Sequence, residues 1–398
     1  MQQAAEEAIE FMARFAERTG LEPEGPQQRY LWTDAFAVCN YLALADATGD
    51  ERFTALALHL IDQVHHVLGR HREDDARSGW ISGLSEREGE AHPTRGGLRI
   101  GKPLPERSPA ESYDEQREWE RDGQYFHYLT KWMHALDQAS RATGQARFNL
   151  WARELAEAAH SGFSFQVPGS SRRMVWKMSI DLSRALVPSM GHHDPLDGFV
   201  TCLELQATAQ MFGTPSSGPD LDQAVYDFAG MTAERDWSTD DPLGLGGLLA
   251  DAARVAQLAR QASFADSHLL NSLLDAAARG ISQWSQRDEL QHSASQRLAF
   301  RELGLAIGLA AVPLIESTLQ PAPDAGARHA VARSALGTLE PYVSVGAEIR
   351  NFWLATINRQ VATWSEHCDI NEVMLATSLV PEGFLELTSP ALHTASHG

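Results

Sequence analysis

The sequence predicts an all-α protein of the (α/α)6 toroid class, a six-hairpin barrel with long loops on one rim. Apolar residues recur three or four positions apart over most of the 398 residues, which is the spacing of one helix face. An Ala-Thr-Gly turn motif occurs twice, starting at Ala47 and Ala142. No strand pattern alternates with the helical segments, apart from a short extended segment at 172–180. An open α-solenoid is the alternative architecture.

Each Ala-Thr-Gly turn joins two amphipathic helices into a tight hairpin. Gly49 and Gly144 fit the residue that follows a helix with a positive φ, and Asp50 fits the N-cap of the next helix. The apolar stripes of these two hairpins run from Leu31 to Ala45, Phe53 to Val67, Tyr125 to Leu136 and Phe148 to Ala159.

The rest of the chain continues as hairpins with different turns. Asp194-Pro195 and Asp241-Pro242 are predicted helix starts, with Asp as N-cap and Pro at the first helical position. Twelve or thirteen helices then form a single domain over 1–398. The further helices are expected at about 4–18, 195–212, 220–232, 243–262, 266–286, 296–318, 326–341, 348–364 and 370–380.

The connections between hairpins differ in length from those within them. Turns within hairpins are short, whereas the links at 71–121 and 164–194 are long, and a toroid places all long links on one rim. Long ordered loops often carry function. The 71–121 segment mixes charges with Trp80, Ile81 and Leu98, so we expect an ordered, lid-like loop.

Charge and composition exclude several classes of partner. With 33 basic and 53 acidic residues the net charge is −20, which argues against binding nucleic acid or an anionic membrane. The three cysteines are far apart and form no CxxC pair, so neither a disulfide framework nor a zinc knuckle is expected. The sequence has no G-x-x-x-x-G-K-[ST], G-x-G-x-x-G or H-E-x-x-H pattern, so no cofactor or metal is expected.

The N-terminal residues and the most apolar stretch of the sequence are informative about where in the cell the protein lies. The first residues run from Met1 and Gln2 into Glu6, Glu7 and Glu10, and they lack the basic and apolar regions of a signal peptide. The stretch 303–315 is too short, and too interrupted by Gly and Pro, to span a bilayer. These features predict a cytoplasmic protein.

The predicted rim gathers the residues that start the inner helices, where the helix dipole and free N–H groups attract anions. Carboxylates, histidines and tryptophans meeting there are typical of a sugar site. The catalytic candidates are Asp34, Asp122, Asp194, Asp197, His127, His192 and His193, and the substrate-binding candidates are Trp32, Gln124, Arg301, Glu302, Arg350 and Trp353; Asp240, Asp241, Arg297 and Asn351 start helices on the same rim.

The stretch Leu31 to Phe53, LWTDAFAVCNYLALADATGDERF, resembles an inner-to-outer hairpin of six-hairpin glycosidases. It is most similar to unsaturated glucuronyl and rhamnogalacturonyl hydrolases, and its Thr-Gly-Asp turn also occurs in N-acylglucosamine 2-epimerases. The resemblance implies a toroid and gives Asp34 the role of general acid/base in hydrating an unsaturated uronic ring.

Three functions follow as hypotheses. The first is a carbohydrate-active enzyme, a glycoside hydrolase with Asp34 as acid and Asp122, Asp194 or Asp197 as its partner. The second is a sugar epimerase or isomerase with His127 and either His192 or His193 as acid/base pair, and the third is a non-catalytic helical binding scaffold. The acidic net charge favours a neutral small-molecule or oligosaccharide substrate over a polyanion.

Structural roles compete with these assignments. Asp122 and Asp194 fit N-caps, Arg301 and Glu302 fit an ion pair, and Tyr125 and Trp132 fit the core, since both lie on an apolar stripe. The cluster His367-Cys368-Asp369 is expected on the face of the tight turns, opposite the long loops, and moves to the functional rim if the helix count is off by one.

Overall fold

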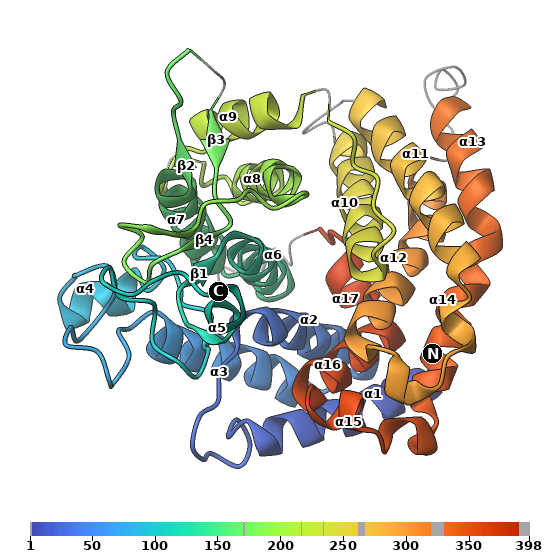
Figure 1. Cartoon of the computed structure of the whole chain (residues 1–398), viewed down its shortest axis with the longest axis horizontal. Helices are drawn as coiled ribbons and strands as arrows, with labels where there is room; N and C mark the ends of the chain where they lie inside the picture. The colour runs from blue at the N-terminus through green and yellow to red at the C-terminus, as the bar shows by residue number, and fades with distance from the viewer. Residues whose placement is uncertain are drawn as a thin grey trace, which may run out of the picture. The chain divides into compact units, whose positions relative to one another are not determined.

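The computed structural model of the chain describes residues 2–169, 172–215, 217–233, 235–261, 267–319 and 330–389. These residues are mostly helical, with five strands of two or three residues, which confirms the predicted all-α class (Figure 1). In the described part of the chain, no helix combines the length and the apolar character that crossing a membrane requires.

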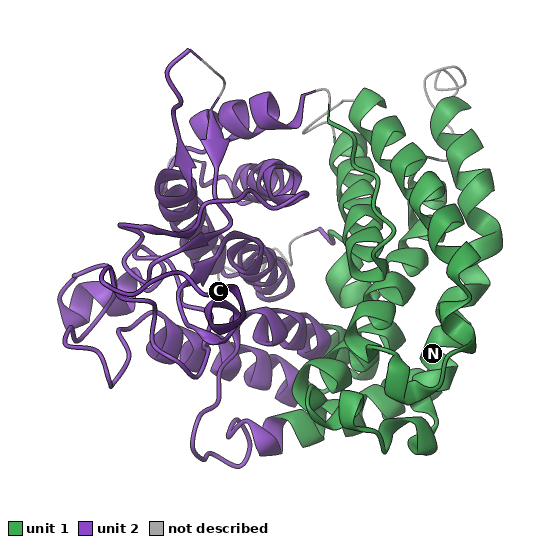
Figure 2. Ribbon diagram, in the orientation of Figure 1, with its two compact units in different colours: residues 1–15, 43–50, 234–387 green, residues 16–42, 51–233, 388–398 purple. Residues whose placement is uncertain are grey.

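Two compact units make up the chain (Figure 2). Unit 1 contains residues 1–15, 43–50 and 234–387, and unit 2 contains residues 16–42, 51–233 and 388–398. Helices α1 (Gln2–Arg18) and α2 (Leu31–Thr48) each contribute residues to both units. The organisation of 1–398 as one domain stays a prediction.

Unit 2 is built on helix hairpins. Helix α6 packs against α7 and α8, and α8 packs against α9. Gly144 ends α6 with a φ of 69°, and Gly49 follows α2 with a φ of 69°, so both predicted glycine turns are confirmed. The helices of this unit after α2 are α3 (Glu51–Leu68), α4 (Glu86–Ala91), α5 (Glu115–Glu120), α6 (Phe126–Thr143), α7 (Ala146–Phe163), α8 (Asp194–Met211) and α9 (Asp222–Thr232).

Short strands hold the start of α6 in place. Strand β1 (Gln124–Tyr125) pairs antiparallel with β4 (Lys177–Met178), which pairs antiparallel with β5 (Ala185–Val187). Strand β2 (Ser164–Phe165) pairs with β3 (Arg173–Met174), also antiparallel. The extended segment predicted at 172–180 is therefore confirmed by β3 and β4. Because β1 runs directly into α6, the sheet sets the position of the first turn of α6.

Unit 1 is held together by a close helix crossing. Helix α12 contacts α10, α14 and α16. A Cβ on Gly246 of α10 would lie 2.0 Å from the carbonyl oxygen of Gly304 of α12, so only glycine permits this approach. The described helices of the unit after α1 are α10 (Pro242–Arg260), α11 (Ser267–Trp284), α12 (Ala299–Thr318), α13 (Ala330–Leu339), α14 (Val343–Leu354), α15 (Ala362–Ser365), α16 (Cys368–Leu379) and α17 (Glu382–Leu385).

One predicted helix is wrong. The helix expected at 348–364 ends at Leu354 and is followed by a 3-10 turn, Thr356–Arg359, and by α15. The Asn358 side-chain amide donates to the carbonyl of Phe352 at 2.8 Å, which takes an acceptor that another helical turn needs. The start of the helix expected at 326–341 lies partly outside the described residues.

Of the caps predicted at Asp122, Asp194 and Asp241, one is confirmed and two are wrong. Asp241 is the N-cap of α10 and accepts from the backbone N–H of Gly244 at 2.8 Å. Asp194 is instead the first helical residue of α8, and His193 precedes it as N-cap. Asp122 lies four residues before α6, because β1 comes between them.

His65 of α3 is a buried histidine in the core of unit 2. Its Nε2 accepts from the indole Nε1–H of Trp132 at 3.2 Å, and the rings of Trp132 and Trp151 meet it edge-on. Burial lowers the pKa of His65 to about 3. The imidazole is therefore neutral in the folded protein, while the unfolded chain titrates near the ordinary histidine value.

Acidification is expected to destabilise the protein through His65. As pH falls below about 6.5, His65 becomes protonated in the unfolded chain but stays neutral in the folded chain until near pH 3. Between these values this histidine lowers the unfolding free energy by up to about 1.4 kcal/mol per pH unit. The variant H65Q keeps an acceptor for Trp132 but does not titrate. Urea denaturation between pH 7.5 and 4.5 measures the difference between wild type and H65Q, which is expected to shrink as pH falls.

The exposed His292 supplies the matched control, because H292Q is expected to track the wild type at every pH. A stability difference between wild type and H65Q that stays constant with pH contradicts the neutral, buried imidazole.

Candidate active site

Five aromatic side chains gather where α6 begins in unit 2. We call them the aromatic cluster: Tyr30, Tyr125, His127, Tyr128 and Trp176. The rings of Tyr125 and Trp176 stack with centroids 4.9 Å apart, and Tyr125 stacks on His127 at 5.6 Å. The hydroxyls of Tyr30 and Tyr128 are 2.7 Å apart. Tyr125 is buried, as predicted for a core position, whereas the other four are partly exposed.

The aromatic cluster continues outward into an exposed tryptophan. Trp119 of α5 lies 5.1 Å from Trp176 between ring centroids, and its side chain is 52% exposed. Flat aromatic faces of this kind pack against the C–H faces of sugar rings, with the polar edges left for hydroxyls.

All three lysines of the chain, Lys102, Lys131 and Lys177, lie around the aromatic cluster. The ammonium of Lys102 is 5.2 Å from the centre of the Tyr30 ring, and that of Lys177 is 5.2 Å from the centre of the Tyr125 ring. Lys131 lies four residues after His127, on the same face of α6. Two of these lysines are ion-paired: Lys131 with Asp197 at 2.6 Å and the buried Lys177 with Glu118 at 2.9 Å.

His127 is the titratable group at the centre of the aromatic cluster. Its side chain is 32% exposed, and its Nδ1 lies 3.9 Å from Oδ1 of Asp194. Desolvation lowers the pKa of His127 to about 4, because it outweighs the opposing charge of Asp197. The imidazole is therefore neutral near pH 7 and able to accept a proton, and Asp194 is placed to stabilise the imidazolium that results.

Further ion pairs follow along the contact between α6 and α8. Lys131 Nζ lies 2.6 Å from Oδ1 of Asp197, near the surface. Deeper in the contact, Nδ1 of the buried His134 lies 2.8 Å from Oε1 of the buried Glu204. These pairs lock the register of the two helices and so place His127 opposite Asp194.

The residue with the family resemblance, Asp34, is buried and ion-paired. Its Oδ1 lies 3.5 Å from Nη1 of Arg29, and its Oδ2 accepts from the backbone N–H of Tyr30 at 2.9 Å. Asp34 is 1% exposed, and its neighbour Trp32 is buried against Phe36. These contacts fix the chain at the start of α2, which favours a structural role for Asp34.

Asp122 and Gln124 tie the long loop to the sheet. The buried carboxylate of Asp122 accepts from Arg99 Nη1 at 2.8 Å, from Arg72 Nη1 at 3.3 Å and from the backbone N–H of Gly101 at 3.0 Å. Gln124 accepts from the N–H of Leu98 at 2.9 Å and donates to the carbonyls at 96 and 180. Both side chains hold the 71–121 segment, all of which the structure describes; that this segment acts as an ordered lid stays a prediction.

The variant D122N is expected to loosen the 71–121 segment. It leaves Arg99 and Arg72 facing a neutral group in a buried site, so we expect a loss of about 2–4 kcal/mol in unfolding free energy and faster proteolysis within 71–121. Urea denaturation and limited trypsin digestion measure the two effects. The exposed Asp74, which also pairs with Arg72, supplies the control D74N; equal effects of the two variants contradict the anchoring role.

His192 and His193 precede α8 and lie against one another, with ring centroids 4.6 Å apart. His192 is exposed and His193 is partly exposed. Their neighbour Asp194 faces His127, so this loop joins the aromatic cluster through Asp194.

The candidates in unit 1 form ion pairs. Arg301 Nε lies 3.0 Å from Oδ1 of Asp241, so Arg301 pairs with the α10 cap and not with Glu302. Glu302 instead makes two bonds with Arg297, at 2.8 and 2.7 Å, and accepts from the indole N–H of Trp353 at 2.8 Å.

The remaining unit 1 candidates lie at the surface or cap a helix end. Arg350 donates to the carbonyl of Ser378 at 3.2 Å, Asn351 is exposed, and Asp240 pairs with Arg287. His367 precedes α16, and its ring lies 5.5 Å from that of Phe300 near the start of α12. The face on which the cluster His367-Cys368-Asp369 lies stays a prediction.

Lys131, Tyr30, Tyr128 and Trp176 were not among the sequence candidates. The rarity of lysine and the four-residue spacing from His127 were available signals for Lys131. Trp176 gave none, since only strand pairing carries it to α6. Among the described residues, no group of three or more His, Cys, Asp or Glu side chains is arranged to hold a metal ion.

Comparison with known proteins gives structural matches alone. No protein-family model and no curated protein matches the sequence. Among solved structures the chain is similar to a GH76 α-mannanase of Bacteroides thetaiotaomicron, with a TM-score of 0.50 and 9% identity over 94% of this chain and 96% of that one.

Two further solved structures have lower scores. One is a sugar epimerase from a ruminal bacterium, with TM-score 0.45 and 11% identity; the other is a D-mannose isomerase, with TM-score 0.44 and 12% identity. Each comparison covers 86% of both chains. The likeness to the mannanase shows the fold: the chain has the (α/α)6 class predicted from its sequence.

Proposed function

We propose that this protein is a carbohydrate-active enzyme that uses His127 as a base to move a proton on a sugar, as an epimerase or isomerase does. The observation that supports this most is the neutral imidazole of His127, held between an aromatic stack and the carboxylate of Asp194. A proton acceptor of this kind is needed to deprotonate the carbon next to a sugar carbonyl.

In the proposed reaction the open-chain sugar lies against the aromatic cluster. The imidazole of His127 takes the proton from the carbon next to the carbonyl, and the electron pair of that C–H bond forms the double bond of an enediol. Lys131 stabilises the oxygen that gains negative charge, and Asp194 stabilises the imidazolium. Protonation of this charged enediol at the same carbon from the other face, with the proton supplied by solvent, gives an epimer. Return of the proton from His127 to the former carbonyl carbon, while the proton of the neighbouring hydroxyl passes to the former carbonyl oxygen, gives an isomer.

The substrate is proposed to be a neutral sugar. Tyr128, Trp176 and Trp119 offer aromatic faces, and the net charge of −20 disfavours a polyanion. The fold is shared with a protein named as an α-mannanase, so it is compatible with carbohydrate chemistry.

Glycoside hydrolysis is the second candidate. Asp194 and Asp197 lie three residues apart in the first turn of α8, which places two carboxylates on one helix face. Asp34 and Asp122 support this reaction less, because both are buried against arginines.

Solvent-exchange NMR separates the two reactions. The protein is incubated in D2O with D-mannose, D-glucose or D-fructose, and in parallel with 4-nitrophenyl α-D-mannoside and α-mannan. Proton transfer predicts loss of the C2 proton signal from an aldose or of a C1 proton signal from the ketose. Release of nitrophenol or reducing sugar without exchange supports hydrolysis and contradicts the first proposal; no reaction in either series supports the non-catalytic scaffold.

A further inference from the structure

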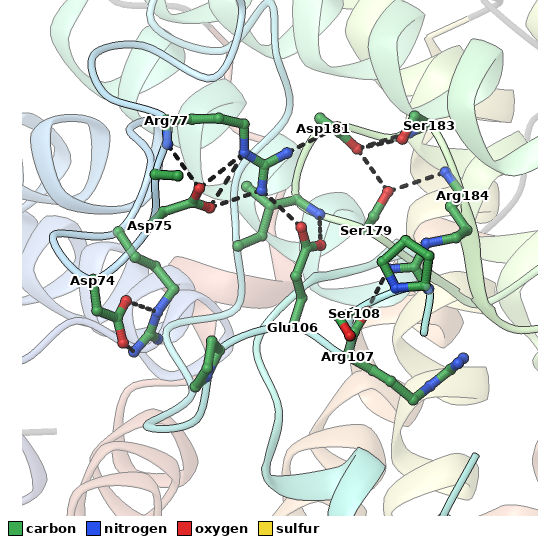
Figure 3. A pocket seen from close by; sticks show the side chains of 15 residues that line it. Asp74, Asp75, Arg77, Glu106, Arg107, Ser108, Ser179, Asp181, Ser183 and Arg184 are labelled. Atoms are coloured by element: carbon green, nitrogen blue, oxygen red, sulfur yellow. Dashed lines mark hydrogen bonds and ion pairs between the residues drawn. The ribbon is translucent and has the colours of Figure 1, made fainter. Parts of the chain in front are cut away.

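A polar pocket lies in unit 2, outside the aromatic cluster. It has a volume of about 500 Å³, within the range of small-molecule sites. Its walls come from the segments 72–77 and 105–109 of the long loop and from the turn 179–184 that follows β4 (Figure 3). It shares no lining residue with the aromatic cluster.

Opposite charges are balanced in the walls of this pocket. The lining contains four arginines and four carboxylates: Arg72, Arg77, Arg107 and Arg184, and Asp74, Asp75, Glu106 and Asp181. Ser108, Ser179 and Ser183 add hydroxyls, and the apolar part is limited to Ala76, Pro105, Pro109 and Ile180. The walls therefore offer many donors and acceptors and no net charge.

Arg77 lies among three of these carboxylates. Its guanidinium is 2.7 Å from Oδ2 of Asp75, 2.7 Å from Oε1 of Glu106 and 2.8 Å from Oδ2 of Asp181, and Figure 3 shows the three carboxylates around it. One cation among three anions leaves carboxylate oxygens with lone pairs to spare. An anionic ligand that enters here is repelled by these three carboxylates.

Local hydrogen bonds keep these carboxylates ionised. A hydrogen bond from Arg77 lowers the pKa of Asp75. Partial burial acts to raise the pKa of Asp181, but hydrogen bonds from Ser183 and Ser179 outweigh it and lower this pKa to about 2. Near pH 7 Asp75 and Asp181 are therefore hydrogen-bond acceptors only, so they favour a ligand that donates hydrogen bonds.

We propose that this pocket binds a neutral polyhydroxylated molecule, a sugar or a sugar alcohol. Ligand O–H groups donate to Asp181 and Glu106, and ligand oxygens accept from Arg77, Arg184 and Ser108, since the hydroxyls of Ser179 and Ser183 already donate to Asp181. A hydroxyl matches both needs because it donates and accepts, whereas an inorganic anion only accepts and an ammonium ion only donates.

Binding here is separated from the reaction proposed for His127 by the probe myo-inositol, which has no carbonyl group and so cannot undergo that reaction. The probes are D-mannose, D-glucose and myo-inositol, with sodium sulfate as the anionic probe. Titration calorimetry and saturation-transfer NMR on the full chain measure affinity and contact. The wild type is expected to bind at least one of the three polyols and not sulfate.

Two variants test the position of the site. Ala76 is exposed on the rim, so A76W fills the pocket without removing a hydrogen bond. D181N removes one charged acceptor. Each is expected to weaken polyol binding about tenfold or more, since hydrogen bonds to charged groups carry this much affinity.

The chain offers a close control for D181N. Asp236 makes the same turn with Ser238 that Asp181 makes with Ser183, and it also pairs with an arginine, Arg279, but it lies in unit 1. D236N is therefore expected to bind polyols as the wild type does, and H127Q is expected to retain the binding that A76W loses.

Three results overturn the proposal: no polyol binds at concentrations up to about 100 mM, sulfate displaces the bound polyol, or A76W and D181N both bind as the wild type does. The two proposals can fail separately. If H127Q keeps full activity while A76W and D181N lose polyol binding that H127Q retains, the proposed function fails and this site stands.

Discussion

The variant H127Q is expected to lower the rate of proton exchange on the substrate sugar by roughly 100- to 10,000-fold, the range usual for loss of a general base. Glutamine matches the imidazole in size and polarity but accepts no proton near pH 7. H127Q leaves Trp176 and Tyr128, the proposed substrate contacts, in place, so we expect kcat to fall much more than KM rises. Initial rates followed by NMR in D2O measure both constants.

The pH profile gives the same prediction a second readout. Because a protonated imidazole accepts no further proton, wild-type kcat/KM is expected to fall as the pH drops through about 4, the pKa that burial imposes on His127. Above that value this group leaves the rate unchanged.

His160 supplies the matched control for H127Q. It also pairs with an aspartate, with 2.8 Å between Nε2 and Oδ2 of Asp227, but it lies on α7 away from the aromatic cluster. H160Q is expected to keep its exchange activity. Full activity of H127Q, or equal losses in H127Q and H160Q, excludes His127 as the base.

The largest effect on stability is expected from D137A, which we predict to remove about 3–5 kcal/mol of unfolding free energy. Asp137 and Arg141 of α6 are both fully buried, with 2.8 Å between Oδ2 and Nε. The Asp137 carboxylate also accepts from the hydroxyl of Thr208 at 2.8 Å and from the amide of Asn149 at 2.9 Å. D137A therefore leaves a guanidinium without its counter-charge in the core.

The direction of this effect follows from the cost of burying charge. Burial raises the pKa of Asp137, and the charge of Arg141 opposes this rise. Each group therefore offsets part of the free-energy cost of burying the other's charge. Urea denaturation measures the loss. The double variant D137A/R141M is expected to be less destabilised than the sum of the single variants, because it removes both charges.

The exposed pair of Arg70 and Glu86 is the control for D137A. E86Q is expected to change the unfolding free energy by less than about 1 kcal/mol, since solvent screens that pair. Additive effects in the double variant, or a D137A that is as stable as E86Q, contradict the buried network.

Much of the fold could be predicted from local patterns. The glycine turns at Gly49 and Gly144, the cap at Asp241 and the helices from α8 to α12 follow from spacing and end signals within one or two turns of the chain. The break after Leu354 could not, because the side chain that competes for a helix carbonyl, Asn358, is not distinguishable in sequence from an ordinary helical residue.

The candidate site was predicted in part. His127 and Asp194 were candidates from their places near helix starts, and the structure brings them within 3.9 Å. The resemblance to unsaturated glucuronyl hydrolases pointed instead to Asp34, which lies buried against Arg29. Neither the place of Trp176 nor the polar pocket could be predicted from the sequence, since they depend on strand pairing and on the path of the long loop.

The sequence by itself determined the helical class, the hairpins and the acidic balance, because apolar periodicity, turn residues and net charge are properties of neighbouring residues or of composition. Only the tertiary structure decided which charged residues form ion pairs with one another. Asp122 meets Arg99 and Arg72, Arg301 meets Asp241, and Asp194 is left facing His127. Such pairings join residues far apart in the chain, so they depend on how the helices and loops pack. For a buried carboxylate such as Asp122 the physical reason is that a charge in the core is stable only beside a counter-charge.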